Sequence, residues 1–235
     1  MEIMDRWTKA QEYEQSWWDK RRDLIDLEFY RTHAGVLLDE IDGISTIEKN
    51  TRILEVGSGA AGTLTFLKSE TRVAVDPLEH FYSTVPRFVE FRDPAVQYLD
   101  CKGEELPFDD KSFDFIIMNN VLDHCELPEK VLAEASRVLA MGGHIYFRQN
   151  IYSRWGLLVR KSAEYFEIDR GHPHTFTKSR LDRCFDSNFL TTLKVKRSGY
   201  FNSWRRELTS GKLKELSKAL TFAPQDTVLY ILRNR

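Results

Sequence analysis

A glycine turn near the start of the chain constrains the fold more than any other feature. The stretch ILEVGSGAAGTL places an apolar run before Gly57, Gly59 and Gly62, which have the spacing G-x-G-x-x-G. Glycines at this spacing let a buried strand turn sharply into a helix, and such turns serve several nucleotide-derived ligands. We therefore predict a strand over residues 52–56, a tight turn, and a helix over residues 62–70.

From residue 51 onward, short apolar runs alternate with helical stretches. This alternation is typical of a mainly parallel sheet covered by helices. The first 50 residues have helical spacing and predict one or two helices. Further strands are expected at residues 72–76, 95–99, 113–118, 144–148, 190–198 and 227–232. Further helices are expected at residues 128–140, 155–165, 177–187 and 204–220.

Composition excludes several classes of protein. The 235 residues are 42% hydrophobic and 30% charged, which is ordinary for a soluble globular domain, and no apolar run is long enough to span a membrane. The net charge of −2 argues against a nucleic acid as partner. The three cysteines are widely spaced, so neither a disulfide framework nor a metal site is expected. The N-terminal residues lack the apolar segment of a secretory signal, so we expect a cytoplasmic protein.

Two acidic residues beside the glycine turn narrow the choice of ligand. The loop lacks the Lys-Ser or Lys-Thr pair of a nucleoside triphosphate site, which leaves a dinucleotide or S-adenosylmethionine. Asp76 ends the second predicted strand, 19 positions after Gly57, where a carboxylate can accept hydrogen bonds from the ribose of either ligand. Glu55 would repel the pyrophosphate of a dinucleotide but attract the cationic groups of S-adenosylmethionine. We therefore favour S-adenosylmethionine, and an NAD-dependent oxidoreductase is the alternative.

Four motifs, in order, resemble those of one enzyme family. ILEVGSGAAG, VAVDPL, GEELPFDDKSFDFIIMNNVLDH and EASRVLAMGGHIYF are similar to the successive motifs of class I S-adenosylmethionine-dependent methyltransferases. The resemblance implies a doubly wound, Rossmann-like α/β fold whose seven-stranded sheet is mainly parallel, with the last strand reversed. It implies an N-terminal helical cap over residues 1–50 and a methyltransferase domain over residues 51–235. Residues 150–176 and 200–222 would be insertions on the side of the methyl acceptor.

The same resemblance implies a set of cofactor contacts and no metal. Lys102 stands where this family often has an aspartate that accepts from the adenine amino group, so Glu104 or a backbone carbonyl is expected to take that part. The methionine part of the cofactor would contact Glu55, Gly57, Ser58 and Gly59, the ribose Asp76 and Pro77, the adenine Gly103 and Glu104, and the floor would be Asn119 and Asn120.

Three histidines are candidates for catalysis or for binding the methyl acceptor. His124 would be the general base, because histidine commonly takes a proton from a hydroxyl or amine nucleophile, or it would cap or pack the next helix. His172 and His174 lie in a segment that tends to wall the methyl-acceptor pocket in similar enzymes. The alternatives for this pair are a metal site, which needs further ligands, and a structural part in the loop.

Two further segments have both a functional and a structural interpretation. Tyr13, Trp17 and Trp18 would form either an aromatic lid that contacts the methyl acceptor or the packed face of a helix. The basic stretch over residues 194–218 would be either a solvated face or a docking surface for an anionic methyl acceptor.

The predicted function is methyl transfer to an oxygen or nitrogen of a small-molecule acceptor by in-line displacement, for which alignment and proton removal are the main requirements. Two alternatives remain: a methyltransferase that acts on RNA or protein, and a catalytically inactive protein that binds S-adenosylmethionine.

Overall fold

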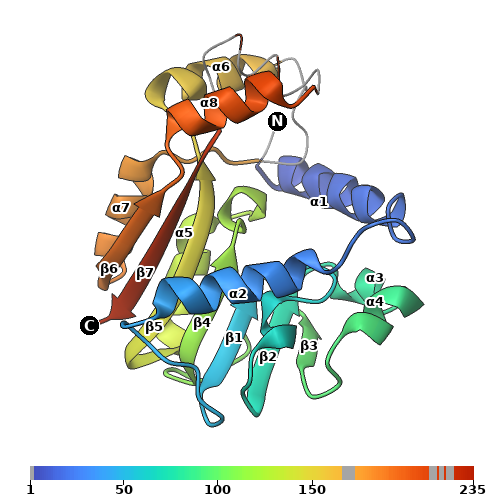
Figure 1. Cartoon of the computed structure of the whole chain (residues 1–235), viewed down its shortest axis with the longest axis vertical. Coiled ribbons are helices and arrows are strands. Elements are labelled where there is room, and N and C mark those ends of the chain that lie inside the picture. The colour runs from blue at the N-terminus through green and yellow to red at the C-terminus, as the bar shows by residue number, and fades with distance from the viewer. Residues whose placement is uncertain (1–2, 166–172, 212–215, 217–219, 221–224) are drawn as a thin grey trace.

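A seven-stranded sheet forms the centre of the molecule (Figure 1). The computed structural model describes residues 3–165, 173–211, 216, 220 and 225–235. The strand order is β3-β2-β1-β4-β5-β7-β6, and β7 runs antiparallel to both of its neighbours. This arrangement confirms the predicted fold class. The strands are β1 (Arg52–Val56), β2 (Thr71–Asp76), β3 (Gln97–Asp100), β4 (Phe113–Asn119), β5 (Leu139–Ile151), β6 (Leu190–Arg197) and β7 (Asp226–Asn234).

The carboxyl ends of the central strands meet at one edge of the sheet. Val56, the last residue of β1, is level with Val75 of β2 and with Met118 of β4. The strand order turns back at β1, because β2 and β3 lie on one side of it and β4 and β5 on the other. Ligands of doubly wound sheets bind in the crevice that such a reversal creates.

Helices cover both faces of the sheet (Figure 1). Apolar side chains of α2 pack on one face, and those of α5 and α7 pack on the other. The long helices are α1 (Ile3–Asp19), α2 (Phe29–Ile41), α5 (Pro128–Val138), α6 (Arg154–Tyr165), α7 (Lys178–Ser187) and α8 (Tyr200–Thr209). The short ones are η1 (Thr63–Phe66), α3 (Glu79–Tyr82), α4 (Pro86–Phe91) and η2 (Leu122–His124).

The helix predicted over residues 62–70 is wrong, because only the four-residue 3₁₀ helix η1 forms there. Its position on the sheet is taken by α2, whose Leu37 and Ile41 are buried against Ile53 and Phe115. The segment after the glycine turn therefore needs only to connect β1 to β2. Of the two N-terminal helices, α2 belongs to the core of the sheet, and the boundary at residue 50 stays a prediction.

The other predicted elements differ from the structure mainly at their ends. β5 is much longer than the predicted strand over residues 144–148, because it pairs with β7 along eight residues as far as Ile151. Thr177 caps α7 as predicted, accepting a hydrogen bond from the amide of Arg180. The helix expected over residues 204–220 begins earlier, at Tyr200, and most residues beyond 211 lie outside the described part of the chain.

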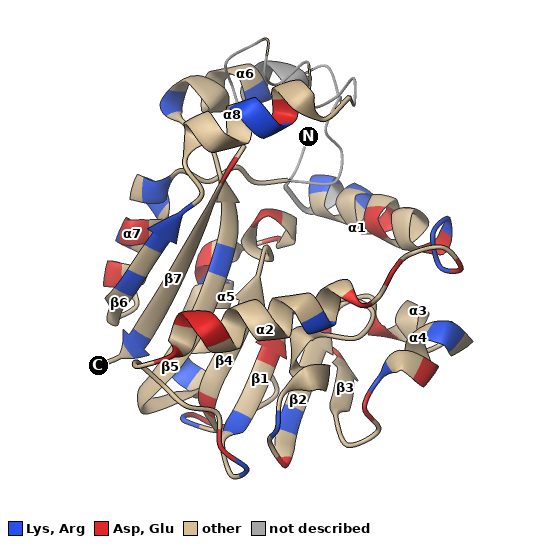
Figure 2. Ribbon diagram, viewed as in Figure 1, with Lys and Arg blue, Asp and Glu red and all other residues tan. Residues whose placement is uncertain are grey.

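Basic residues are frequent in β6, within the stretch from residue 194 (Figure 2), and several of their side chains are paired with acids. Lys194 and Lys196 of the edge strand β6 both contact the carboxylate of Glu40. Arg197 contacts Asp226, whose side chain is fully buried. These pairs hold β6 to α2 and β7, so this part of the stretch has a structural role. Among the described residues, no helix is long and apolar enough to cross a membrane.

Candidate active site

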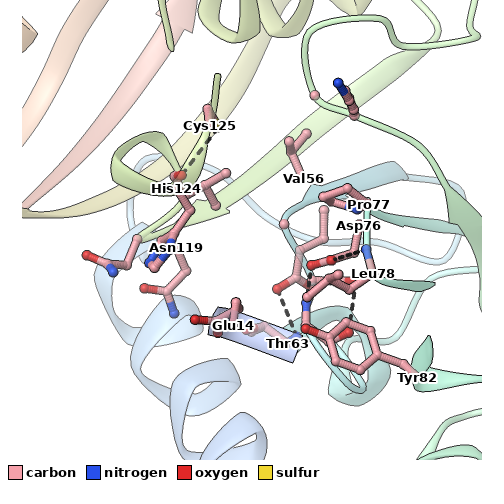
Figure 3. A pocket seen from close by; sticks show the side chains of 18 of the residues that line it. Glu14, Val56, Thr63, Asp76, Pro77, Leu78, Tyr82, Asn119, His124 and Cys125 are labelled. Atoms are coloured by element: carbon pink, nitrogen blue, oxygen red, sulfur yellow. Dashed lines mark hydrogen bonds between the residues drawn. The ribbon is translucent and has the colours of Figure 1, made fainter. Parts of the chain in front are cut away.

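A cavity of about 410 Å³ lies at the carboxyl ends of β1, β2 and β4 (Figure 3). Residues of α1 and α2 also line it. Its volume is within the usual range for small-ligand sites. All ten residues predicted to contact the cofactor line it: Glu55, Gly57, Ser58, Gly59, Asp76, Pro77, Gly103, Glu104, Asn119 and Asn120.

Two glycines at the end of β1 have conformations and neighbours that exclude a side chain. Gly57 has φ +70°, and a Cβ there would lie 2.7 Å from a methyl group of Val121. Gly59 has φ +61°, and a Cβ there would lie 2.5 Å from the hydroxyl oxygen of Tyr30. The turn therefore keeps its backbone open to a ligand while side chains from α2 and the β4 end press close to it.

Glu55 is almost fully buried and holds the turn together. Its carboxylate accepts hydrogen bonds from the amides of Thr63 and Leu64, at 3.0 and 2.8 Å, so it fixes the start of η1. Burial raises the pKa of Glu55 to about 7. The residue lines the cavity and is bonded to the backbone of its own loop at the same time.

Asp76 at the end of β2 has a similar double position. Its two carboxylate oxygens accept from the amides of Gly59 and Leu78, at 2.9 and 3.0 Å. Burial, together with the nearby charges of Glu14 and Glu79, raises the pKa of Asp76 to about 6. Figure 3 shows Asp76 beside Pro77 and Leu78, across the cavity from Asn119.

The next wall of the cavity is formed by the loop after β3. A Cβ on Gly103 would lie 2.9 Å from Val56 and 3.0 Å from Val131, so the backbone passes tightly between β1 and α5. Glu104 is buried and accepts hydrogen bonds from the amides of Glu126 and Leu127, just before α5. Lys102 lies over the ring of Trp7 at 3.8 Å and contacts the carboxylate of Glu126.

The loop after β4 supplies the opposite wall. Asn120 has φ +59°, a left-handed conformation that is uncommon for residues other than glycine. Its side-chain oxygen accepts from the amide of Asn150 and from Gln149, which ties this loop to β5. His124 lies in η2, lines the cavity and is 4.0 Å from the carboxylate of Asp123.

The aromatic residues of α1 divide between the cavity and the surface. Trp18 lines the cavity and packs edge-to-face on Tyr82 and Phe88. Trp17 and Tyr13 lie outside the cavity lining, and Tyr13 is 48% exposed. The contacts of these three residues with a methyl acceptor stay predictions.

The two histidines of the GHPH segment differ in what the structure describes. His174 lies outside the cavity lining, where its Nε2 is 3.1 Å from the carbonyl oxygen of Glu126 and its amide donates to Asp123. His172 lies outside the described residues. Within the described part of the chain, no group of three or more His, Cys, Asp or Glu residues is arranged to hold a metal ion.

Sequence reasoning missed several residues that line the cavity, among them Glu14 on α1, Tyr30 and His33 on α2, and Arg148 on β5. Glu14 accepts from the indole of Trp18 and lies close enough to Asp76 to raise its pKa. Helical spacing revealed α1 and α2, but no sequence signal indicated which of their residues would face the glycine turn.

Comparisons with known proteins agree with this geometry. Residues 54–147 match the family model described as a methyltransferase domain. An uncharacterized protein from Methanocaldococcus jannaschii is 32% identical over 196 residues, which cover 83% of this chain and 77% of that protein. The crystal structure of a geranyl diphosphate C-methyltransferase from Streptomyces coelicolor, bound to S-adenosyl-L-homocysteine, superposes with a TM-score of 0.65 at 16% identity, covering 91% of this chain and 86% of that one. The chain belongs to the class I S-adenosylmethionine-dependent methyltransferases.

Named relatives of this methyltransferase have different acceptors. A thiol S-methyltransferase from Homo sapiens is 28% identical over 136 residues, which cover 54% of this chain and 55% of the relative. A sarcosine/dimethylglycine N-methyltransferase from Aphanothece halophytica is 28% identical over 111 residues, covering 45% of this chain and 40% of the relative. The methyltransferase thus spans about half the length of these named relatives.

The cofactor of this methyltransferase is S-adenosylmethionine, and the cavity fits it. Its lining joins a crowded glycine turn to buried acids on β1 and β2, which suits a ligand with a ribose and two cationic groups.

Proposed function

We propose that this methyltransferase methylates an oxygen or nitrogen atom of a small-molecule acceptor. One observation carries the proposal: besides the predicted cofactor residues, the cavity is lined by the polar side chains of His124 and Arg148 and by residues of α1 and α2. A cavity of about 410 Å³ suits a small molecule better than a strand of RNA or a folded protein. The sarcosine/dimethylglycine relative supports a small nitrogen acceptor, and the thiol relative makes sulfur the rival atom.

The cofactor contacts proposed for this site follow the walls of the cavity. Glu55 and the backbone from Gly57 to Gly59 would hold the methionine part, with Ser58 between the glycines. Asp76 and Pro77 would hold the ribose, Gly103 and Glu104 the adenine, and Asn119 and Asn120 would form the floor after β4. The carboxylates of Glu55 and Asp76 keep further lone pairs for a ligand, since each of their oxygens accepts a single hydrogen bond from the backbone.

Methyl transfer requires little covalent chemistry from the residues of the protein. S-adenosylmethionine supplies a methyl group that its sulfonium already activates. The walls of the cavity align the acceptor atom and exclude water. We propose that His124 removes the proton of the acceptor, because its imidazole lies in the cavity on the β4 side and is 25% exposed.

Substitution of His124 by Gln tests this assignment. We expect turnover to fall by roughly 100- to 10,000-fold, as for the loss of a general base, while affinity for S-adenosylhomocysteine stays within about twofold. His174→Gln, which changes the same side chain outside the cavity, is the matched control. Turnover is followed as S-adenosylhomocysteine release with amine, hydroxyl and thiol acceptors of similar size. Equal losses of cofactor binding and turnover in His124→Gln would show that the residue has a structural role. Activity with thiol acceptors alone would show that the methylated atom is sulfur and not oxygen or nitrogen.

A further inference from the structure

A cluster of hydrogen-bond donors occupies the end of the cavity away from β2. Arg148 ends the parallel part of β5 and is level with Asn119 of β4, and His33 reaches them from α2. All three line the cavity. Within the sheet, both β1 and β4 lie between Arg148 and the β2 acid Asp76.

The hydrogen bonds of the cluster have only one consistent direction. The guanidinium of Arg148 can only donate, so the oxygen of Asn119 accepts from it at 3.2 Å. The Asn119 amide nitrogen must then donate to Nδ1 of His33, also at 3.2 Å. An imidazole that accepts at Nδ1 carries its proton at Nε2, so His33 has a donor left and no acceptor.

The charge of the cluster is positive and uncompensated. Among the described residues, no carboxylate pairs with Arg148, and its hydrogen bond to Asn119 leaves most of its N–H donors for a ligand. Burial and the charge of Arg148 lower the pKa of His33, so the imidazole is neutral near pH 7. The other cation that lines the cavity, Lys102, lies at the Gly103 wall and is paired with Glu126.

A neighbouring side chain adds to the donors. Asn150 of β5 lines the cavity, and its side-chain oxygen accepts from the hydroxyl of Thr227. The NH₂ group of the Asn150 side chain donates to no described residue. Hydrogen-bond donors from β4, β5 and α2 thus lie around one fixed positive charge, the guanidinium of Arg148.

We propose that the methyl acceptor carries a carboxylate, which Arg148 binds beside Asn119 and His33. This inference rests on the proposed function, and it names the class of small molecule that the site takes. A carboxylate fits better than a phosphate monoester, because it carries one negative charge against the single cation here and matches the planar fork of a guanidinium. The carboxylate serves as the anchor that points the nucleophilic oxygen or nitrogen of the acceptor toward β1.

The rival ligand for Arg148 is the carboxylate of the cofactor itself. Eight of the ten proposed cofactor contacts lie at or just after the ends of β1, β2 and β3, and Asn119 and Asn120 lie at the end of β4, whereas Arg148 lies one strand further, on β5. The two possibilities differ in one measurable respect: only a cofactor contact makes the affinity for S-adenosylhomocysteine depend on Arg148.

Binding of a matched pair of probes tests the proposal. Propionate and its neutral isostere propionamide are titrated by NMR into the protein saturated with S-adenosylhomocysteine. We expect the wild type to bind propionate at least about tenfold more tightly, Arg148→Gln to lose this preference, and Arg148→Lys to keep part of it. Arg183→Gln, a loss of the same charge at an exposed position of α7, should keep the full preference.

Each other outcome overturns the proposal. Equal binding of the two probes by the wild type, or binding of neither, removes the carboxylate anchor. If Arg148→Gln still prefers propionate to propionamide, Arg148 does not bind the carboxylate. A loss of affinity for S-adenosylhomocysteine in both Arg148 variants, with Arg183→Gln unchanged, assigns the guanidinium to the cofactor. The proposed function fails separately, since it requires that the wild type bind S-adenosylhomocysteine at all.

Discussion

Glu55 and Asp76 are two buried carboxylates that serve the fold and the ligand at once. Each accepts backbone hydrogen bonds that shape the glycine turn, and each lines the cavity. Burial disfavours their ionised forms, whereas a bound cation favours them. Protonation of the two carboxyls should therefore be coupled to cofactor binding.

This coupling predicts a dependence on pH. Burial raises the pKa of Glu55 to about 7 and that of Asp76 to about 6, above the value of about 4 for unfolded carboxyls. These two carboxyls thus bind more protons in the ligand-free protein than in the unfolded chain between about pH 4 and pH 7, and their contribution to the free energy of unfolding falls as the pH rises through this window. Affinity for S-adenosylhomocysteine, which carries an ammonium group, should rise by roughly tenfold between about pH 5.5 and 7.5.

Calorimetric titration at several pH values checks this expectation. Glu55→Gln should reduce the pH dependence of both the affinity for S-adenosylhomocysteine and the free energy of unfolding, because the glutamine side chain cannot titrate. Glu90→Gln, on the exposed side of α4, is the control and should leave both unchanged. An undiminished pH dependence in Glu55→Gln would show that another group is responsible.

A second prediction at the residue scale concerns Gly59. Alanine there would adopt a left-handed conformation, at a cost of about 1–2 kcal/mol, and its Cβ would collide with the hydroxyl of Tyr30. Gly43 has φ +72° but open space around it, so Gly43→Ala carries the backbone cost without the collision. We expect Gly59→Ala to lower the melting temperature more than Gly43→Ala does, and Tyr30→Phe in the same chain to recover part of the difference. Equal changes in melting temperature for the two variants would show that the collision with the Tyr30 hydroxyl does not contribute to the loss of stability.

At the scale of elements, α2 replaces the helix that was expected after the glycine turn. It covers the sheet beside β1 and brings Tyr30 and His33 to the cavity. The same helix therefore contributes to the core and to the site.

Two adjacent leucines of α2 measure its part in the core. Leu37 is fully buried, whereas Leu38 is 44% exposed. We expect Leu37→Ala to lower the free energy of unfolding by about 2–5 kcal/mol, and Leu38→Ala by no more than about 0.5 kcal/mol. Denaturant unfolding of the two variants provides the comparison. Similar values for both would mean that α2 does not cover the sheet as described.

Sequence reasoning succeeded where function and fold share a local pattern. The turn after β1 and the acid that ends β2 are fixed by spacing along the chain, so the cofactor side of the cavity was predictable. Arg148 was inside a predicted strand, and His33 inside a helical region. Their meeting depends on the register of β4 with β5 and on the packing of α2, which no spacing along the chain encodes. The helix predicted over residues 62–70 is wrong for the same reason, since α2, which is distant in sequence, takes its place on the sheet.

At the scale of the whole molecule, the strand order divides the cavity. The acids lie toward β1 and β2, and the donor cluster of Arg148, Asn119 and His33 lies toward β4 and β5. A cationic cofactor and an anionic methyl acceptor would thus approach from opposite sides of the reversal in strand order. Trp18 and Glu14 of α1 line the same cavity.

Calorimetric titration with S-adenosylhomocysteine and with NADH tests the central claim most directly. The account predicts one molecule of S-adenosylhomocysteine per chain and no binding of NADH. Asp76→Asn should weaken the affinity by roughly 10- to 100-fold through loss of a charged hydrogen-bond acceptor, and Asp109→Asn, an exposed control, should not change it. Absence of S-adenosylhomocysteine binding at about 1 mM, or binding of NADH in its place, would contradict the account.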